Sequence, residues 1–178
     1  GYHEGVNLAF DANNMRLAMI WHGEFIDGAR HWIARGQGFQ PPAGNDVIRL
    51  PEGLAIAELN TKDSPWPQSE YRTKELEFDG YVLDKMQRPT FKYTRDEISI
   101  MDKPVPVGSS SEEKPGVIRR TLKFFGKGNS PNLYLRLAQG NFEKDRGTFS
   151  NSELSLSVKG GEVLAERGEL RVPIQWIG

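Results

Sequence analysis

The chain has 178 residues, a formal net charge of −1 and no cysteine, which suits a single domain with an ordinary hydrophobic core. The lack of cysteine excludes disulfides, thiolate metal ligands, a cysteine nucleophile and covalently attached haem within this chain. Without a basic excess we expect no nucleic-acid partner, and no apolar run approaches the roughly 20 residues that span a bilayer.

The first third of the chain predicts a hairpin, then a long loop. Residues 6–10 and 15–21 read as two strands joined by a turn of Asp and Asn residues. The second strand is apolar at nearly every position, which indicates cover on both faces. Residues 34–51 are rich in Gly and Pro and predict a long loop. Residues 54–59 fit either a short helix or a strand.

The rest of the chain alternates apolar and polar residues, which is typical of antiparallel strands with one buried face. Residues 104–116 predict a second long loop. In the strand at residues 117–125 the alternation leaves Arg120 on the core side, so we expect it to have a buried carboxylate partner or to lie at a strand edge. The remaining predicted strands cover residues 75–83, 90–94, 97–101, 133–137, 154–158 and 170–174.

About ten strands separated by turns predict an all-β fold, an antiparallel two-sheet β-sandwich that spans residues 1–178 as a single domain. The chain starts at Gly1 rather than Met. We therefore expect either that a signal peptide has been removed or that the chain is an excised piece, which would be a module of a larger protein.

A cluster of polar and aromatic residues directly follows the most apolar strand, at an edge where loops commonly carry function. The candidate ligand-binding residues are Trp21, His22, Glu24, Asp27, Arg30, His31 and Trp32.

Three interpretations of this cluster stay open. Two histidines and two carboxylates are suitable ligands for a divalent metal, but the spacing of His22 and His31 matches no short metal motif, so we predict no metal site. The tryptophans could stack on sugar rings while Asp27 and its neighbours bind hydroxyl groups. Alternatively, both tryptophans belong to the core, because large aromatic side chains are mostly buried.

No catalytic residues are predicted. Glycoside hydrolysis needs two carboxylates roughly 5–10 Å apart, and Glu24 with Asp27 or Asp79 with Asp84 are available pairs. With 24 acidic residues in a nearly neutral chain, however, such pairs are inevitable. The sequence also contains no Gly-x-Ser-x-Gly motif for a serine nucleophile.

Two stretches carry a family resemblance. Residues 7–27 follow the pattern N-x-x-F-D, R-L-x-x-x-W-x-G-x-F-I-D, and residues 78–93 follow F-x-G-Y-x-L-D, R-P-T-F-x-Y. Both resemble a β-rich domain of large secreted proteins of planctomycetes and related bacteria, which often also carry c-type cytochrome or sugar-dehydrogenase-like propeller domains. These motif positions also have structural explanations: glycines at turns or bulges, a proline at a strand start, and core positions for Phe10, Trp21, Phe25, Tyr81 and Phe91.

The resemblance implies a non-catalytic accessory module of a periplasmic or extracellular protein, either redox (cytochrome c-associated) or carbohydrate-processing. Its partner would be a neighbouring domain or subunit, such as a c-type cytochrome, and no cofactor is expected in this chain. The alternatives are a carbohydrate-binding or carbohydrate-active domain that uses the aromatic and polar edge, and a purely structural domain marked by a large exposed apolar patch.

Overall fold

A computed structural model describes residues 1–33, 38–68, 76–109, 116–126 and 132–174, except for the side chains of Arg30 and His31. Within these residues the fold is all-β and antiparallel, as the sequence predicts, and none of the helical structure is long and apolar enough to cross a membrane. The elements are β1 (Val6–Asp11), β2 (Arg16–His22), α1 (Ala29–Ile33), β3 (Asn45–Arg49), β4 (Ile56–Glu58), β5 (Leu76–Leu83), β6 (Pro89–Arg95), β7 (Ile98–Val107), β8 (Val117–Phe125), β9 (Leu133–Gln139), β10 (Glu143–Asp145), β11 (Thr148–Ser150), β12 (Ser155–Ser157), β13 (Leu164–Glu166) and β14 (Glu169–Pro173).

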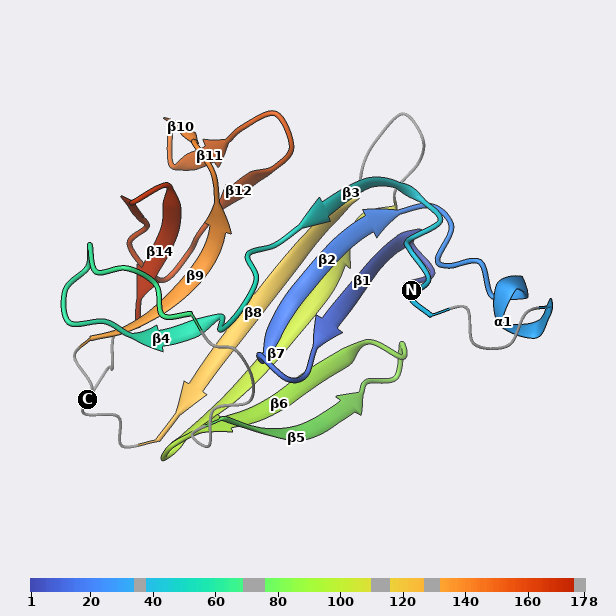
Figure 1. Ribbon diagram of the computed structural model, residues 1–178, viewed down its shortest axis with the longest axis horizontal. Helices are drawn as coiled ribbons and strands as arrows, with labels where there is room; N and C mark the ends of the chain where they lie inside the picture. The colour runs from blue at the N-terminus through green and yellow to red at the C-terminus, as the bar shows by residue number, and fades with distance from the viewer. Residues whose placement is uncertain (34–37, 69–75, 110–115, 127–131, 175–178) are drawn as a thin grey trace.

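The fourteen strands of the described residues form four small sheets (Figure 1). Their orders are β1-β2-β3, β5-β6-β7-β8, β13-β14-β9-β4 and β10-β11-β12. This pairing does not show the two-sheet sandwich that the sequence predicts. In Figure 1 the β1-β2-β3 sheet crosses in front of the β5–β8 sheet, and α1 projects from the body of the molecule.

The hairpin of β1 and β2 is confirmed. Its turn is held by Asp11, whose Oδ1 accepts from the backbone N–H groups of Asn13 and Asn14 at 3.0 and 3.3 Å. The Asp11 Oδ2 accepts from the Nε of Arg16 at 3.1 Å and so ties the turn to the start of β2. All residues from Met15 to His22 are buried or half-buried, in agreement with a strand covered on both faces.

Both predicted long loops contain strands. β3 pairs with β2 inside the segment 34–51, so the loop prediction is wrong for residues 45–49, while residues 34–37 lie outside the described part. β7 continues to Val107 through Pro104 and Pro106, although the sequence predicts a loop from residue 104, of which residues 110–115 are not described.

The prolines of β7 are tolerated because β6 pairs with β7 only as far as Asp102. Beyond that point β7 has a partner on one side only, β8, so a missing N–H interrupts no ladder on the open side. The carbonyl of Pro104 accepts a 2.6 Å hydrogen bond from the hydroxyl of Tyr2, which brings the N-terminal segment across this open edge.

A bulge in β5 determines which of its side chains face the β1-β2-β3 sheet. Phe78 pairs with Tyr93 and Gly80 pairs with Lys92, so β5 has one extra residue at this point. Gly80 has a φ of +96°, a conformation that glycine adopts without strain. Because of the extra residue, Phe78 and Tyr81 lie on the same face although three positions separate them.

Phe10 joins the β1-β2-β3 sheet to the β5–β8 sheet. Its ring stacks on Phe91 at 3.9 Å between centroids, and it packs against Phe78 and Tyr93 at 5.9 and 6.2 Å. From here the main core continues through Leu122 and Phe124 of β8 to β4, β9 and the residue that follows β14. The segment 54–59, which the sequence predicts as either a short helix or a strand, contains β4. The strand is therefore the correct alternative.

Two groups of buried charges lie beside this core. Arg120 points inward and contacts both carboxylate oxygens of Asp102 at 2.6–3.0 Å, as predicted for an inward arginine. Glu169 accepts from Arg136 at 3.0 Å and from Arg171 at 2.6 Å. All three side chains of this second group are at most 8% exposed.

Candidate functional site

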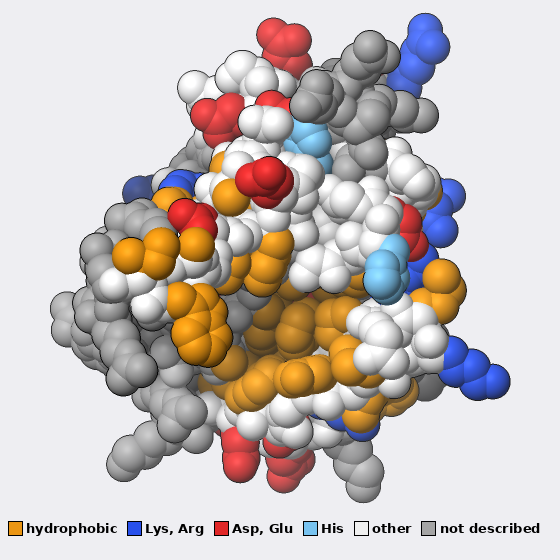
Figure 2. Space-filling model, turned by 90° about the vertical axis from the view of Figure 1, so that its right-hand side faces the viewer, with side chains coloured by type: hydrophobic (Ala, Val, Ile, Leu, Met, Phe, Trp, Pro, Cys, Tyr) orange, Lys and Arg blue, Asp and Glu red, His pale blue; other side chains and the backbone are white. Residues whose placement is uncertain are grey.

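An apolar hollow opens where the β1-β2-β3 sheet meets the β5–β6 hairpin of the β5–β8 sheet. It has a volume of about 260 Å³. Figure 2 shows it as a depression lined by hydrophobic side chains on the face that carries the N-terminus. Its lining comes from the N-terminal segment, β1, and the β5–β6 hairpin: Gly1, Tyr2, Leu8, Tyr81, Leu83, Gln87, Pro89 and Phe91.

Strand register explains why these side chains meet. Tyr81 pairs with Phe91 and Leu83 with Pro89, and directly paired residues of antiparallel strands share a face. The bulge at Gly80 turns Tyr81 toward this face, where its ring meets the edge of Phe91 at 6.3 Å. Phe91 is itself covered by Phe10, so the hollow has a closed inner wall and an open mouth.

The mouth of the hollow is strongly exposed. Tyr81 is 60% and Leu83 is 48% exposed, which is unusual for large apolar side chains on adjacent positions of one face. The neighbouring Val82 and Met86 are 46% and 60% exposed. Exposed apolar groups gathered beside a hollow are typical of interaction surfaces.

The N-terminal segment forms the rim. Tyr2 is held to β7 by its hydrogen bond to Pro104, and Glu4 forms an ion pair with Arg88 at the start of β6. Burial raises the pKa of the Tyr2 hydroxyl to about 12, so it stays a donor even above its ordinary pKa of 10.0.

Asp84 stabilises the tip of the β5–β6 hairpin. Its Oδ1 accepts from the backbone N–H groups of Met86 and Arg88 at 2.9 and 3.0 Å, and its Oδ2 accepts from Lys103 at 3.0 Å. The backbone hydrogen bond from Arg88 is the main cause of a lowered pKa of Asp84, so the carboxylate keeps the tip ordered at neutral pH. The rim beside the hollow is therefore preorganised.

The structure separates the ligand-binding residues that the sequence predicts. Trp21 and His22 lie at the buried end of β2 and are 4% and 5% exposed. The Trp21 Nε1 donates to the Glu24 carbonyl at 3.0 Å, and its ring stacks on Phe25 at 5.7 Å. The His22 Nε2 lies 2.6 Å from the Oδ2 of Asp46. The Trp21 ring, which is buried and stacked on Phe25, therefore has no face free to stack on a sugar.

Three of the other predicted residues, Glu24, Asp27 and Trp32, are exposed. Glu24 and Asp27 face solvent, and the Asp27 Oδ1 accepts from the backbone N–H of Ala29 at 3.0 Å, which caps the start of α1. Trp32 on α1 is 87% exposed. The side chains of Arg30 and His31 lie outside the described residues. Among the residues that are described, no three His, Asp or Glu side chains gather into a possible metal site.

The predicted edge and the hollow are neighbours. Gly1 lines the hollow, and a side chain added at this position would come within 3.8 Å of the Phe25 ring, which stacks on Trp21. Phe25 is 47% exposed, so the prediction that it belongs to the core is wrong, as it is for Tyr81. The core positions of Phe10, Trp21 and Phe91 are confirmed, with Phe10 half-buried.

Reasoning from the sequence missed the hollow itself. The signal was the motif at residues 78–93, which contributes Tyr81, Leu83, Pro89 and Phe91 to the lining. Alternation assigns its aromatic residues to the core, because it predicts a buried face and not the point where the opposite sheet ends.

A family profile described as a domain of unknown function, DUF6797, matches residues 8–102. This region is just over half of the chain and runs from β1 into β7, so it includes the hollow from Leu8 to Phe91. Neither the curated proteins nor the solved structures contain a match to the chain. The chain belongs to the DUF6797 family.

Proposed function

We propose that this chain is a non-catalytic accessory module that binds a neighbouring domain or subunit through the apolar hollow and its rim. The observation that supports this proposal is the exposure of Tyr81 and Leu83 at the mouth of a hollow of about 260 Å³. Ligand pockets commonly have about 300–1,000 Å³, so the size suits one inserted side chain or ring better than a large ligand.

The character of the walls supports a protein partner. Leu8, Leu83, Pro89 and Phe91 offer no hydrogen-bonding side chains, and Gln87 is the polar side chain of the lining apart from the tyrosine hydroxyls. Protein interfaces have an apolar, aromatic centre and a polar rim. Here the rim is supplied by Asp84 and by the Glu4–Arg88 pair.

The resemblance described above extends the proposal. It supports a module of a periplasmic or extracellular redox or carbohydrate-processing protein, with a c-type cytochrome as a proposed partner. Both points rest on the resemblance and not on the hollow.

Cysteine labelling tests the proposal, because the chain has no cysteine of its own. Leu83→Cys introduces one thiol at the mouth of the hollow, and Phe125→Cys introduces a control thiol. Phe125 is 50% exposed, close to the 48% of Leu83, and pairs with Ser99 at the opposite end of the β5–β8 sheet.

Each variant is labelled with a maleimide in the isolated chain and in the full-length natural protein. We expect position 83 to react much more slowly in the full-length protein and position 125 to react equally in both. Equal rates at position 83, or a natural protein without a further domain or subunit, would overturn the proposal.

Carbohydrate binding is the second candidate function. It is favoured by the exposed rings of Trp32 and Tyr81, which are 87% and 60% exposed and so have faces available for stacking. Titration calorimetry against a panel of oligosaccharides tests it. Saturable heat that Tyr81→Ser or Trp32→Ser removes would support it, and no heat with any glycan would exclude it.

A further inference from the structure

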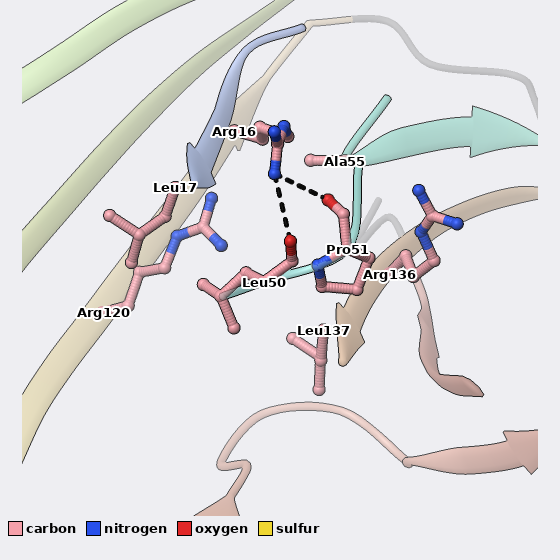
Figure 3. A pocket seen from close by; sticks show the side chains of 8 residues that line it. All are labelled: Arg16, Leu17, Leu50, Pro51, Ala55, Arg120, Arg136 and Leu137. Atoms are coloured by element: carbon pink, nitrogen blue, oxygen red, sulfur yellow. Dashed lines mark hydrogen bonds between the residues drawn. The ribbon is translucent and has the colours of Figure 1, made fainter. Parts of the chain in front are cut away.

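A second, much smaller cavity lies where the start of β2, the segment after β3, β8 and β9 meet (Figure 3). Its volume is about 10 Å³, so it holds at most one water. Arg16 lines it and donates through Nη1 to the carbonyls of Leu50 and Pro51 at 3.1 and 2.9 Å. The arginines of the lining also have carboxylate partners: Arg16 pairs with Asp11, Arg120 with Asp102 and Arg136 with Glu169. This cavity therefore belongs to the core, and the feature that the fold does not explain lies on the surface.

The segment around α1 carries the most exposed large apolar side chains of the described residues. Trp32, Ile33 and Phe39 are 87%, 85% and 71% exposed, and every other large apolar side chain in the described part of the chain is at most 60% exposed. We call these three residues the apolar tip. None of them belongs to a core cluster of the described residues. Exposed apolar side chains that gather in one place mark an interaction surface.

The apolar tip is carried by a projection with a fixed base. Ile26 forms a bridge with Pro42, and the Ala43 N–H donates to the Phe25 carbonyl at 3.2 Å, so the chain leaves and returns at one neck. The Phe25 ring stacks on the buried Trp21 and so anchors the neck to β2. In Figure 1, α1 projects from the body of the molecule and forms one end of its longest axis. A flat surface that approaches this end therefore meets α1 first.

The segment that carries the tip differs in charge from the rest of the chain. Residues 28–44 contain two arginines and one histidine but no aspartate or glutamate. With histidine neutral the segment has a formal charge of +2, so the other residues together carry −3 of the total of −1. Aromatic and apolar side chains next to basic residues are typical of segments that lie in the headgroup region of a membrane. An anionic surface attracts this segment and repels the rest, which favours an orientation with the tip toward the surface.

We propose that the apolar tip inserts into the headgroup region of a membrane that contains anionic phospholipid. Trp32, Ile33 and Phe39 enter the boundary between headgroups and acyl chains, while the positive charge of residues 28–44 attracts the lipid phosphates. A protein partner would need a concave and acidic surface that fits this tip, whereas an anionic bilayer accepts a convex apolar tip of any shape. This inference does not depend on the proposed function of the hollow, whose lining contains none of the three tip residues.

Vesicle sedimentation tests the proposal with the unaltered chain. Binding is compared between vesicles of phosphatidylcholine alone and vesicles of phosphatidylcholine and phosphatidylglycerol in equal amounts. Two positive charges should strengthen binding to the anionic vesicles by about five- to thirty-fold at low salt, and added salt should reduce this gain. No binding to the anionic vesicles, or equal binding to both compositions, would overturn the proposal.

A double variant locates the contact. Trp32→Ser with Ile33→Ser removes two side chains that are almost fully exposed, so the fold should be kept, which an unchanged Tm would confirm. Its binding to the anionic vesicles should fall roughly tenfold or more. Val117→Ser with Phe125→Ser is the matched control, because these side chains are 57% and 50% exposed at the two ends of β8, and it should bind as the unaltered chain does. Equal losses for the two double variants would contradict the assignment of the tip.

Tryptophan fluorescence separates insertion from adsorption by charge alone. Lipids with brominated acyl chains quench a tryptophan that enters the bilayer. The chain has four tryptophans, of which Trp21 and Trp66 are buried in the fold. We expect quenching on binding, and we expect Trp32→Phe to remove it while the variant still binds. Binding without quenching, or quenching that persists in Trp32→Phe, would overturn the proposal.

The alternative occupant is a protein, and a single thiol detects it. Trp32→Cys places the only cysteine of the chain at the tip. In the full-length natural protein without membranes, we expect this thiol to react with a maleimide as fast as in the isolated chain. Strong protection there would show that a protein covers the tip, and would overturn the proposal.

Discussion

The Arg120–Asp102 ion pair gives the sharpest test of how this fold is held together. The Asp102 side chain is 1% exposed and binds the Nε and Nη2 of Arg120 at 2.6–3.0 Å. Asp102→Asn keeps the shape but removes the charge, which leaves the guanidinium buried without a counter-ion. Removing one partner of a buried pair costs about 3–5 kcal/mol. For a chain of this length the Tm should fall by about 6–20 °C.

The next residue on β7 provides a matched control. Lys103 pairs with Asp84 at 3.0 Å, but the two side chains are 40% and 35% exposed. Solvent screens such a pair, so Lys103→Met should cost about 0–1 kcal/mol. Urea denaturation of both variants measures the difference as a change in midpoint at constant slope. Equal losses for the two variants would refute the reasoning, because burial would then not decide the strength of the pair.

Three further predictions concern the turns, the bulge and the rim. Gly80→Ala should lower the free energy of unfolding, measured by urea denaturation, by about 1–3 kcal/mol, because φ at this position is +96°. Gly28→Ala should be nearly neutral, because Gly28 has equally open surroundings and no positive φ. Similar losses for the two variants would contradict the role of the bulge. The raised pKa of Tyr2, about 12, means that its protonated hydroxyl contributes stability in full below the ordinary value of 10.0, and that this contribution is lost as pH rises through 12. Tyr2→Phe should therefore flatten the loss of stability at alkaline pH. An unchanged slope of stability against pH would refute the assignment of this loss to Tyr2. For Asp11, burial raises the pKa of the carboxyl group, but hydrogen bonds from the turn outweigh this effect and the pKa is lowered. The carboxylate therefore contributes to the stability of the fold above the ordinary value of 3.8, and this contribution is lost as pH falls below that value. Asp11→Asn should make unfolding less sensitive to acid, and equal acid sensitivity of the variant and the unaltered chain would argue against this role.

Much of the strand pattern could be predicted because alternation is a local property. In β8 every second residue from Ile118 to Phe124 is half-buried and the residues between them are exposed, as the sequence indicates. β3 was missed because four of its five residues are exposed, so it has no buried face to produce a pattern. The full length of β7 was missed because the prolines argue against a strand unless one side is known to be unpaired.

The candidate site was less predictable because it depends on where one sheet ends relative to another. Tyr81 and Phe91 are paired, yet one is 60% and the other 9% exposed. The difference arises because the Phe10 ring stacks on Phe91 and not on Tyr81. No local pattern contains this information. For the predicted cluster, no local pattern separates the buried Trp21 and His22 from the exposed Trp32.

Binding of the separated neighbouring domain to this chain tests the central claim most directly. Titration calorimetry would compare the unaltered chain with Leu83→Asp in the hollow and Phe125→Asp at the opposite end of the sheet, two positions of similar exposure. We predict saturable binding that Leu83→Asp weakens at least tenfold and Phe125→Asp leaves unchanged. The absence of binding, or equal affinities for both variants, would contradict the assignment of the hollow as the docking site.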